Sequence, residues 1–357
     1  MKKTRYTLFF ALLFSAALLQ LIWGQSKETT ATTDPDHITL SWTGNPATTM
    51  TVTWRADSTI DHGIVQYRKK NENNPAVRTS EARAHEFTTD LGTSKIFSST
   101  LEGLSPNSEY SYRVGNGSSW SEQNSFTTAP ATVSKYKFLV FGDSQSSVTA
   151  SDPYGEWRQT IHAAFDTEQF SLPQNGPDSL KNQVYSFDYG PVHLIALDSQ
   201  SLEQKSSGDI LALQKPWLEK DLSSSSASWK IAFFHRAPYG VKQGRDEAEI
   251  RDAFCPILEK YGVQLVFNAH DHGIKRTYPI KDGQPVDNPL KGTVYYVTGR
   301  SGAKTYEDIE PNEHSAFFYA PLDQPNYLIV EGTSEEITVK VVMLDGTVID
   351  TFSIRQP

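Results

Sequence analysis

Three short apolar runs of the chain are each followed at once by residues that can bind metal ions. The runs span residues 137–141, 230–234 and 263–267. Runs of this length and composition are typical of buried β-strands. In a layered α/β domain the carboxyl ends of such strands lie side by side, and functional sites are built at that rim. The pattern therefore predicts an α/β domain with a site where these three strands end.

The potential ligands that follow the runs are one aspartate and three histidines: Asp143, His235, His270 and His272. Each has a structural explanation when taken alone, because a Gly-Asp pair often forms a turn and a lone histidine often lies in the core. The Asn-Ala-His-Asp-His segment is more informative, since two imidazoles one residue apart favour a metal. Because all three runs end in a ligand, we expect the four side chains to bind metal in one crevice.

Length and charge limit the classes of protein to which the chain can belong. Its 357 residues are enough for two domains with their own cores. The 33 Lys and Arg residues against 42 Asp and Glu residues give a net charge of −9, which argues against a nucleic-acid partner because phosphate-backbone binding needs a basic face. Cys255 is the only cysteine, so no internal disulfide can form.

The amino terminus has the pattern of a secretory signal peptide. A basic start at residues 2–5 precedes a largely apolar stretch at 7–23, and small and polar residues follow at 24–26. We expect a signal peptide at residues 1–25, a secreted or extracytoplasmic location, and no membrane span after cleavage. The alternative is an uncleaved membrane anchor, for which the apolar stretch is slightly short.

Two domains are expected after the signal peptide. Residues 26–36 are polar and threonine-rich, as in a linker. Between residues 37 and 128, short alternating runs broken by turn residues predict a β-sandwich with Trp54 in its core. The segment 101–114 resembles the penultimate strand of a fibronectin type III domain, in which Leu104 packs inward and a tyrosine closes the corner.

Residues 135–357 alternate strand and helix patterns and therefore predict the layered α/β domain. The apolar spacing predicts a helix over 245–261 and a second over 210–222, with Leu213 and Leu218 facing inward. The tail has strand patterns and an Asp-Gly turn, which predict antiparallel strands at the C-terminus. The expected fold is thus an all-β sandwich followed by a layered α/β domain.

Five segments of the second domain carry further motifs: 141–145 (Phe-Gly-Asp-Ser-Gln), 183–190, 233–239 (Phe-Phe-His-Arg-Ala-Pro-Tyr), 266–280 and 292–299. Together they resemble the motifs and framework strands of the calcineurin-like metallophosphoesterases, and within them the purple acid phosphatase group. The predicted sandwich resembles the leading domain of that group. The resemblance covers nearly the whole chain after residue 25.

The resemblance implies hydrolysis of a small phosphorylated substrate by two metal ions and a bound water. Carried over by position, Asp143 and His272 would bind the first ion, and His235 and His270 the second. The ligand types suit iron, zinc or manganese. Arg236, beside His235, is expected to contact the substrate phosphate.

The chain departs from the family between residues 157 and 177. The bridging-aspartate motif and the Gly-Asn-His motif are missing, so the family's proton donor has no counterpart and we assign no catalytic residue. We expect a shortened central sheet. Two close cations repel each other without a bridging carboxylate, so we expect one shared cation or none. Four weak candidates could replace the missing ligands: Asp152, His162, Asp166 and Asn175.

Other polar residues near the predicted strand ends have ordinary structural interpretations. We expect structural or solvated charges at Lys275, Arg276 and Arg300. Asp198 follows a predicted strand and is expected to cap its end, and His193 alternates within that strand. We expect neither residue to take part in chemistry.

Two functions remain open at this point. The first is a metal-dependent phosphoester hydrolase of the acid phosphatase type, impaired by the loss of the ligand motifs. The alternative is a non-catalytic extracytoplasmic binding protein on a degenerate hydrolase scaffold. A deletion in the gene sequence would also explain the missing motifs, and sequencing the locus across codons 160–170 tests that explanation.

Overall fold

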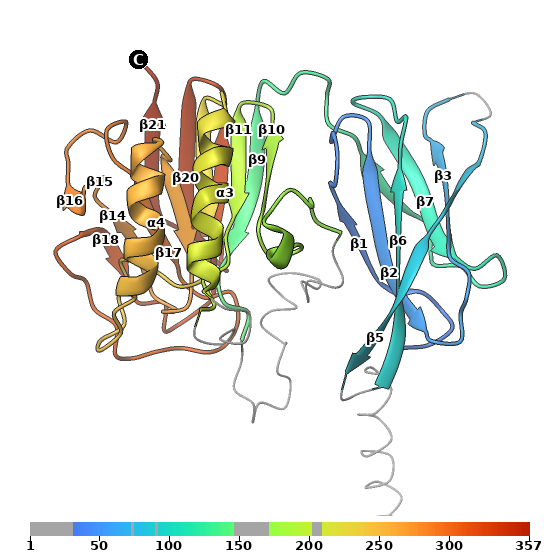
Figure 1. Cartoon of the computed structure of the whole chain (residues 1–357), viewed down its shortest axis with the longest axis horizontal. Helices are drawn as coiled ribbons and strands as arrows, with labels where there is room; N and C mark the ends of the chain where they lie inside the picture. Colours follow the sequence, from blue (N-terminus) through green and yellow to red (C-terminus); the bar gives the residue numbers. More distant parts are fainter. Residues whose placement is uncertain (1–30, 73–74, 90–91, 146–170, 202–208) are drawn as a thin grey trace, which may run out of the picture. The chain divides into compact units, whose positions relative to one another are not determined.

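The computed structural model describes residues 31–72, 75–89, 92–145, 171–201 and 209–357. The chain forms two compact units (Figure 1). The first contains the described residues up to Thr128 together with Ser171, and the second contains the other described residues from Ala129 onward. No helix within these described ranges is long and apolar enough to cross a membrane.

The first unit is a sandwich of two antiparallel four-stranded sheets. One sheet has the order β1 (Asp36–Ser41), β2 (Met50–Asp57), β6 (Gly92–Leu101), β5 (Arg83–Thr89). The other has the order β4 (Arg78–Glu81), β3 (Ile64–Lys69), β7 (Glu109–Gly115), β8 (Asn124–Thr127). The short alternating runs of the sequence therefore do form a sandwich.

The core of the sandwich contains the residues that the pattern placed there. Trp54 is 2% exposed and stacks on Phe97 with ring centroids 5.4 Å apart. Leu104 is buried, and the hydroxyl of Tyr110 accepts a hydrogen bond from the Ser105 N–H at 2.9 Å. A tyrosine thus closes the turn before β7, as the sequence predicts.

The second unit contains two larger sheets and a small hairpin. The seven-stranded sheet has the order β10 (Tyr185–Tyr189), β11 (Val192–Ala196), β12 (Trp229–Phe233), β13 (Leu265–Asn268), β17 (Val294–Thr298), β14 (Ile274–Thr277), β18 (Ser315–Tyr319). The four-stranded sheet has the order β21 (Val348–Arg355), β20 (Glu336–Met343), β19 (Asn326–Gly332), β9 (Tyr136–Phe141). The hairpin pairs β15 (Ile280–Lys281) with β16 (Gln284–Pro285).

Helices cover one face of the seven-stranded sheet, and the four-stranded sheet covers the other. The described helices are α3 (Ile210–Ser224), α4 (Ala248–Lys260) and the short 3-10 helix η2 (Asp178–Leu180). Figure 1 shows α3 and α4 side by side over the strands. One apolar cluster fills the helix side, and a second lies between the two sheets. Strands β11, β12, β13 and β17 run parallel, so their carboxyl ends meet at one rim.

The helical periodicity is correct for α4 and partly wrong for α3. Ile250, Phe254 and Leu258 are buried as expected. Leu213, expected to face inward, is 43% exposed, whereas Gln214 is fully buried. The amide of Gln214 bonds the backbone N–H and C=O of Asp198, at 2.8 Å in each case. This polar side chain therefore occupies the inward position for which the apolar pattern favoured Leu213.

Strand β9 lies in a different sheet from the one that its apolar sequence suggested. It pairs antiparallel with β19, whereas β12 and β13 are parallel neighbours in the seven-stranded sheet. The expectation that the three strands end side by side in one layer is thus wrong for β9. The two sheets meet directly after it: a Cβ added at Gly142 would lie 2.5 Å from the carbonyl oxygen of Gly299, which follows β17. Only glycine permits this approach.

His193 is a structural residue in β11, which lies next to the edge strand β10 of the seven-stranded sheet. Its side chain is 7% exposed, and its two ring nitrogens lie 2.7 Å from carboxylate oxygens of Asp188 and Asp221. Burial opposes protonation, but the bonds to the two carboxylates outweigh burial and raise the pKa of His193 to about 9. The ring is therefore a buried cation between two acids at neutral pH.

We predict that this cation makes the stability of the second unit depend on pH. Because the folded pKa lies above the ordinary value of about 6.5, the contribution is complete below pH 6.5 and is lost as the pH rises through 9. Urea unfolding from pH 6.5 to 9.5 should show the native chain losing about 2 kcal/mol more than the His193→Asn variant. Parallel stability curves for the two proteins would contradict this account.

Candidate metal centre

The four predicted ligands lie at the ends of three strands that belong to two sheets. Asp143 follows β9 in the four-stranded sheet, and its backbone oxygen accepts hydrogen bonds from the N–H groups of Ser301 and Gly302. His235 follows β12, and its carbonyl accepts the N–H of Ala269, which begins the turn after β13. That turn carries the remaining two histidines. Backbone bonds therefore join the end of β9 to the segment after β17, and the end of β12 to the turn after β13.

The structure brings the four side chains together. His235 Nε2 lies 3.0 Å from His270 Nδ1. Asp143 Oδ1 lies 3.7 Å from His235 Nε2 and 3.6 Å from His272 Nε2. Asp143 and His272 are buried, and His235 has a third of its side chain exposed. One carboxylate and three imidazoles thus lie close together, and His235 is the most exposed of the four side chains.

These separations match those of atoms that share one cation. Two ligand atoms at about 2.1 Å from an ion lie about 3.0 Å apart at a right angle and about 3.6 Å apart at a wide angle. The observed pairs cover this range. Within the part of the chain that the structure describes, however, no group of three or more His, Cys, Asp or Glu side chains could hold a metal ion as the side chains stand. The three measured pairs therefore have the spacing of metal ligands, but the described side chains do not form a complete set of ligands.

His270 and His272 both have left-handed backbone conformations, with φ of 73° and 55°. Each such non-glycine residue costs about 1 kcal/mol or more, and strain of this kind gathers at functional sites. The turn places His272 Nε2 3.6 Å from Asp143 Oδ1 and His270 Nδ1 3.0 Å from His235 Nε2, and Asp143 Oδ2 accepts the backbone N–H of His270 at 2.7 Å. The strained turn therefore serves to aim two ligands at one place.

Asp271, between the two histidines, holds the turn in that conformation. It is 1% exposed, and its Oδ2 accepts the N–H groups of Val241 and Lys242 at 2.6 and 3.1 Å. Its Oδ1 accepts a bond from Arg245 Nη1 at 2.6 Å, and the same Nη1 bonds the carbonyl of His270 at 3.0 Å. Asp271 points away from the ligands and fixes the turn to the segment after β12.

The hydrogen bond of His272 and the lowered pKa of His270 leave ring nitrogens free to bind a metal ion. The Nδ1–H of His272 donates to the carbonyl of Lys304 at 2.7 Å, which leaves the Nε2 lone pair facing Asp143. Burial and then the charges of Arg245, His235 and Arg236 lower the pKa of His270 to about 4, so its ring is neutral.

Burial alone would raise the pKa of Asp143. The interactions with His272, His235 and the His270 N–H outweigh that effect and lower this pKa below its usual value. The site therefore offers an anionic oxygen from Asp143 and a neutral imidazole from His270, which is the charge state that a metal ion requires of such ligands.

Arg236 lies behind the histidines and has an acid partner. It is 8% exposed, its Nη1 bonds Glu247 at 2.9 Å, and its Nε bonds Gln200 at 3.3 Å. Glu247 Oε1 in turn lies 3.9 Å from His270 Nε2. The predicted contact between Arg236 and substrate thus stays a prediction, and the contacts observed are with residues that surround His270.

The other polar residues singled out by the sequence have structural partners. Lys275 is buried and bonds Asn312, and Arg276 forms a two-pronged ion pair with Asp350. Arg300 bonds the carbonyls of Pro321 and Gly302.

Two of the remaining candidates also have structural contacts, and three cannot be placed. The Asp198 Oδ1 accepts the N–H of Gln200, which is a strand-end turn. Asn175 pairs with the backbone of Ser186. The other proposed replacement ligands lie outside the described residues: Asp152, His162 and Asp166.

The sequence did not reveal the surroundings of the centre. Arg245 and Glu247 help to line a cavity of about 760 Å³ that also includes Arg251 and His314. The ring of Tyr306 lies 4.6 Å from that of His272. The one available signal was Asp271, whose place between two ligands could have marked it as a supporting residue. Tyr306 belongs to a loop with no motif.

Comparison with known proteins relates both parts of the chain to phosphatase families. The family model described as "Purple acid Phosphatase, N-terminal domain" matches residues 35–128, and that described as "Calcineurin-like phosphoesterase" matches residues 131–273. The mouse protein "Acid phosphatase type 7" is 25% identical over 90% of this chain and 91% of its own length. "Purple acid phosphatase 15" of Arabidopsis thaliana is 28% identical over 45% of this chain and 30% of its own length.

Solved structures share the fold. A purple acid phosphatase from yellow lupin seeds, PPD1, superposes with a TM-score of 0.73 at 20% identity and covers 90% of this chain and 74% of its own. The structure of PhoD superposes with a TM-score of 0.56 at 11% identity and covers 89% of each chain. The sandwich and the layered α/β domain therefore occur together in other proteins.

We predict that Asp271 stabilises the turn without binding metal itself. The Asp271→Asn change leaves Arg245 without its charged partner and should lower the free energy of unfolding by about 2 kcal/mol. The matched control is Asp246→Asn, which removes an exposed partner of Arg251 and should cost less than about 0.5 kcal/mol. Urea unfolding measures both, and equal effects would show that the turn does not depend on Asp271.

Proposed function

We infer that this chain, which belongs to the calcineurin-like metallophosphoesterases with a purple acid phosphatase N-terminal domain, is a metal-dependent phosphoester hydrolase. The observation that carries the proposal is the convergence of Asp143, His235, His270 and His272 from three strand ends. The family models and the acid phosphatase relatives support the same reaction class. Export of the chain, predicted from residues 1–25, is part of the proposal.

The loss of the bridging-aspartate motif favours one cation over two, because two close cations repel each other without a bridging carboxylate. The lone pair of His272 is directed by the Lys304 carbonyl, and the carboxylate of Asp143 lies within 3.7 Å of two imidazoles. We therefore assign Asp143, His235, His270 and His272 as the ligands of one iron, zinc or manganese ion. Such an ion would lower the pKa of a bound water and polarise a phosphoryl oxygen.

The chain's own residues would hold the substrate beside these ligands. The cavity next to His270 is lined by Arg245 and Arg251, whose guanidinium groups are suited to phosphate oxygens. Glu247, paired with Arg236, places a negative charge at the wall of this cavity near His270. Asp246 and Glu313 also line the cavity, and Arg245 and Arg251 are paired with Asp271 and Asp246, so a phosphorylated substrate would have to displace these acids from the two guanidinium groups.

Catalysis should be slow because part of the family machinery is missing from the sequence. The chain contains no Gly-Asn-His motif. A second Gly-Asp pair ends at Asp209, but that carboxylate accepts the N–H of Ala212 and caps α3. The bridging carboxylate and the family's proton donor thus have no counterpart by sequence. The expected result is an impaired hydrolase.

We predict at most one metal ion per chain and a turnover of p-nitrophenyl phosphate below about 1 s⁻¹, the lower end of ordinary enzyme rates. Metal content is measured by plasma mass spectrometry and turnover by absorbance. His272→Gln should lower metal affinity at least about tenfold. His62→Gln changes an exposed histidine of the first unit and should change nothing. Two ions per chain with rapid turnover would defeat the impairment proposal.

A second candidate is a non-catalytic binding protein on the same scaffold. The open ligand shell among the described residues and the missing motifs favour it. It predicts saturable binding of orthovanadate or inorganic phosphate by the metal-loaded protein, with no release of p-nitrophenol above the His272→Gln background. Any turnover that is lost in His272→Gln and kept in His62→Gln would exclude this candidate.

A further inference from the structure

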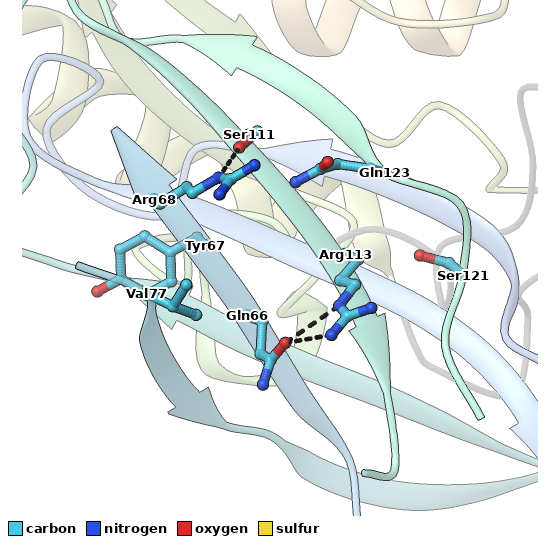
Figure 2. A pocket seen from close by; sticks show the side chains of 8 residues that line it. All are labelled: Gln66, Tyr67, Arg68, Val77, Ser111, Arg113, Ser121 and Gln123. Carbon is cyan, nitrogen blue, oxygen red and sulfur yellow. Dashed lines mark hydrogen bonds between the residues drawn. The ribbon is translucent and has the colours of Figure 1, made fainter. Parts of the chain in front are cut away.

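The outer face of the β4-β3-β7-β8 sheet in the first unit carries a groove of about 280 Å³. Figure 2 shows its floor, which is made of two cross-strand pairs. Gln66 on β3 lies opposite Arg113 on β7, and Arg68 lies opposite Ser111. Two arginines therefore stand on one face of the sheet as diagonal neighbours. The Cα atoms of such neighbours are about 7–8 Å apart.

Arg113 is held in place by neutral groups. Its Nε and Nη2 donate to the Gln66 side-chain oxygen at 3.0 and 2.7 Å (Figure 2), and its Cζ lies 4.3 Å from the ring centroid of Trp120. No acceptor for its Nη1 lies among the residues that the structure describes. The guanidinium group is thus fixed in orientation and retains donors for a ligand.

Arg68 has one weak contact in the groove. Its Nε lies 3.4 Å from the Ser111 hydroxyl oxygen (Figure 2). Neither Arg68 nor Arg113 has a carboxylate partner in the described parts of the chain, and no acid lines the groove. Residues 37–128 hold 8 basic and 9 acidic residues, so this local excess of positive charge does not follow from composition. Two like charges on one sheet face repel unless an anion neutralises them.

The rest of the lining indicates what else the ligand carries. Ser121 and Gln123 offer hydroxyl and amide groups along one side, and Val77 offers apolar surface along the other, where the ring of Tyr67 belongs to the core of the sandwich. The guanidinium group of arginine binds planar or tetrahedral oxyanions, whereas side-chain amides and hydroxyls bind the hydroxyl groups of sugars. The volume is at the lower end for ligand pockets, about 300 Å³. The groove therefore fits one unit of a larger polar ligand.

We propose that this groove binds an acidic saccharide, a sugar unit that bears a carboxylate or sulfate group. Arg68 and Arg113 hold the oxyanion, and Gln66, Ser121 and Gln123 contact the hydroxyl groups. Such a site would attach the chain to an anionic glycan by a surface that the hydrolase reaction does not use. The proposal does not depend on the proposed function, because it rests on the first unit alone.

Calorimetric titration of the full-length protein tests the proposal. The probes are tri-galacturonic acid, which carries carboxylates, a chondroitin 4-sulfate tetrasaccharide, which carries sulfates as well, and maltotriose, which is neutral. We expect a charged probe to bind and maltotriose not to bind. Binding should weaken as NaCl rises from 50 to 500 mM. Preference for the second charged probe would identify sulfate as the anion, and equal or better binding of the first would identify carboxylate.

Variants separate this site from general charge attraction. Arg68→Gln and Arg113→Gln should each weaken binding at least tenfold. Arg83→Gln, on the exposed strand β5 of the other sheet, makes the same charge change and should not weaken binding. Arg113 also packs on Trp120, so Arg68→Gln is the variant less able to disturb folding. The proposal is wrong if neither charged probe binds, if maltotriose binds equally, or if Arg83→Gln weakens binding as much as Arg68→Gln.

Discussion

The close approach of two sheets after β9 and β17 is the constraint on which the centre depends. Gly142 lies against the Gly299 carbonyl, and the Gly142 N–H donates to the Ser301 hydroxyl at 3.0 Å. These contacts hold the backbone of Asp143 against the seven-stranded sheet although β9 belongs to the other one. A side chain at residue 142 would push the carboxylate away from the histidines. The metal chemistry proposed here therefore begins with a steric requirement for glycine.

The second requirement is the turn that positions two imidazoles two residues apart, at His270 and His272. Both residues have left-handed backbone conformations, with φ of 73° and 55°, so the two rings are positioned by the turn and not by the alternation of an extended strand. Asp271 stabilises that conformation by accepting backbone N–H groups from another segment. Ligand geometry at this site is thus maintained by a buried carboxylate that does not face the ligands. Glu247 is a second supporting acid: its Oε1 lies 3.9 Å from His270 Nε2 and is paired with Arg236.

Much of this arrangement could be predicted from the sequence, because apolar runs that end in ligands leave few ways to fold. The convergence of the four side chains follows from that pattern. The sheet to which β9 belongs does not, since an apolar run is compatible with either sheet. The surroundings of the centre were also beyond prediction, because Lys304 and Arg245 are placed by loops. Arg236 illustrates this limit. Its position beside His235 suggested a contact with the substrate phosphate, whereas its observed partner is Glu247.

The central claim is that one cation sits among Asp143 and the three histidines. X-ray diffraction from metal-loaded crystals, with data collected at the absorption edge of the bound metal, tests it most directly. The account predicts a single anomalous peak within about 2.3 Å of Asp143, His235, His270 and His272 atoms. Two peaks in the crevice, or a peak elsewhere with none in the crevice, would contradict it.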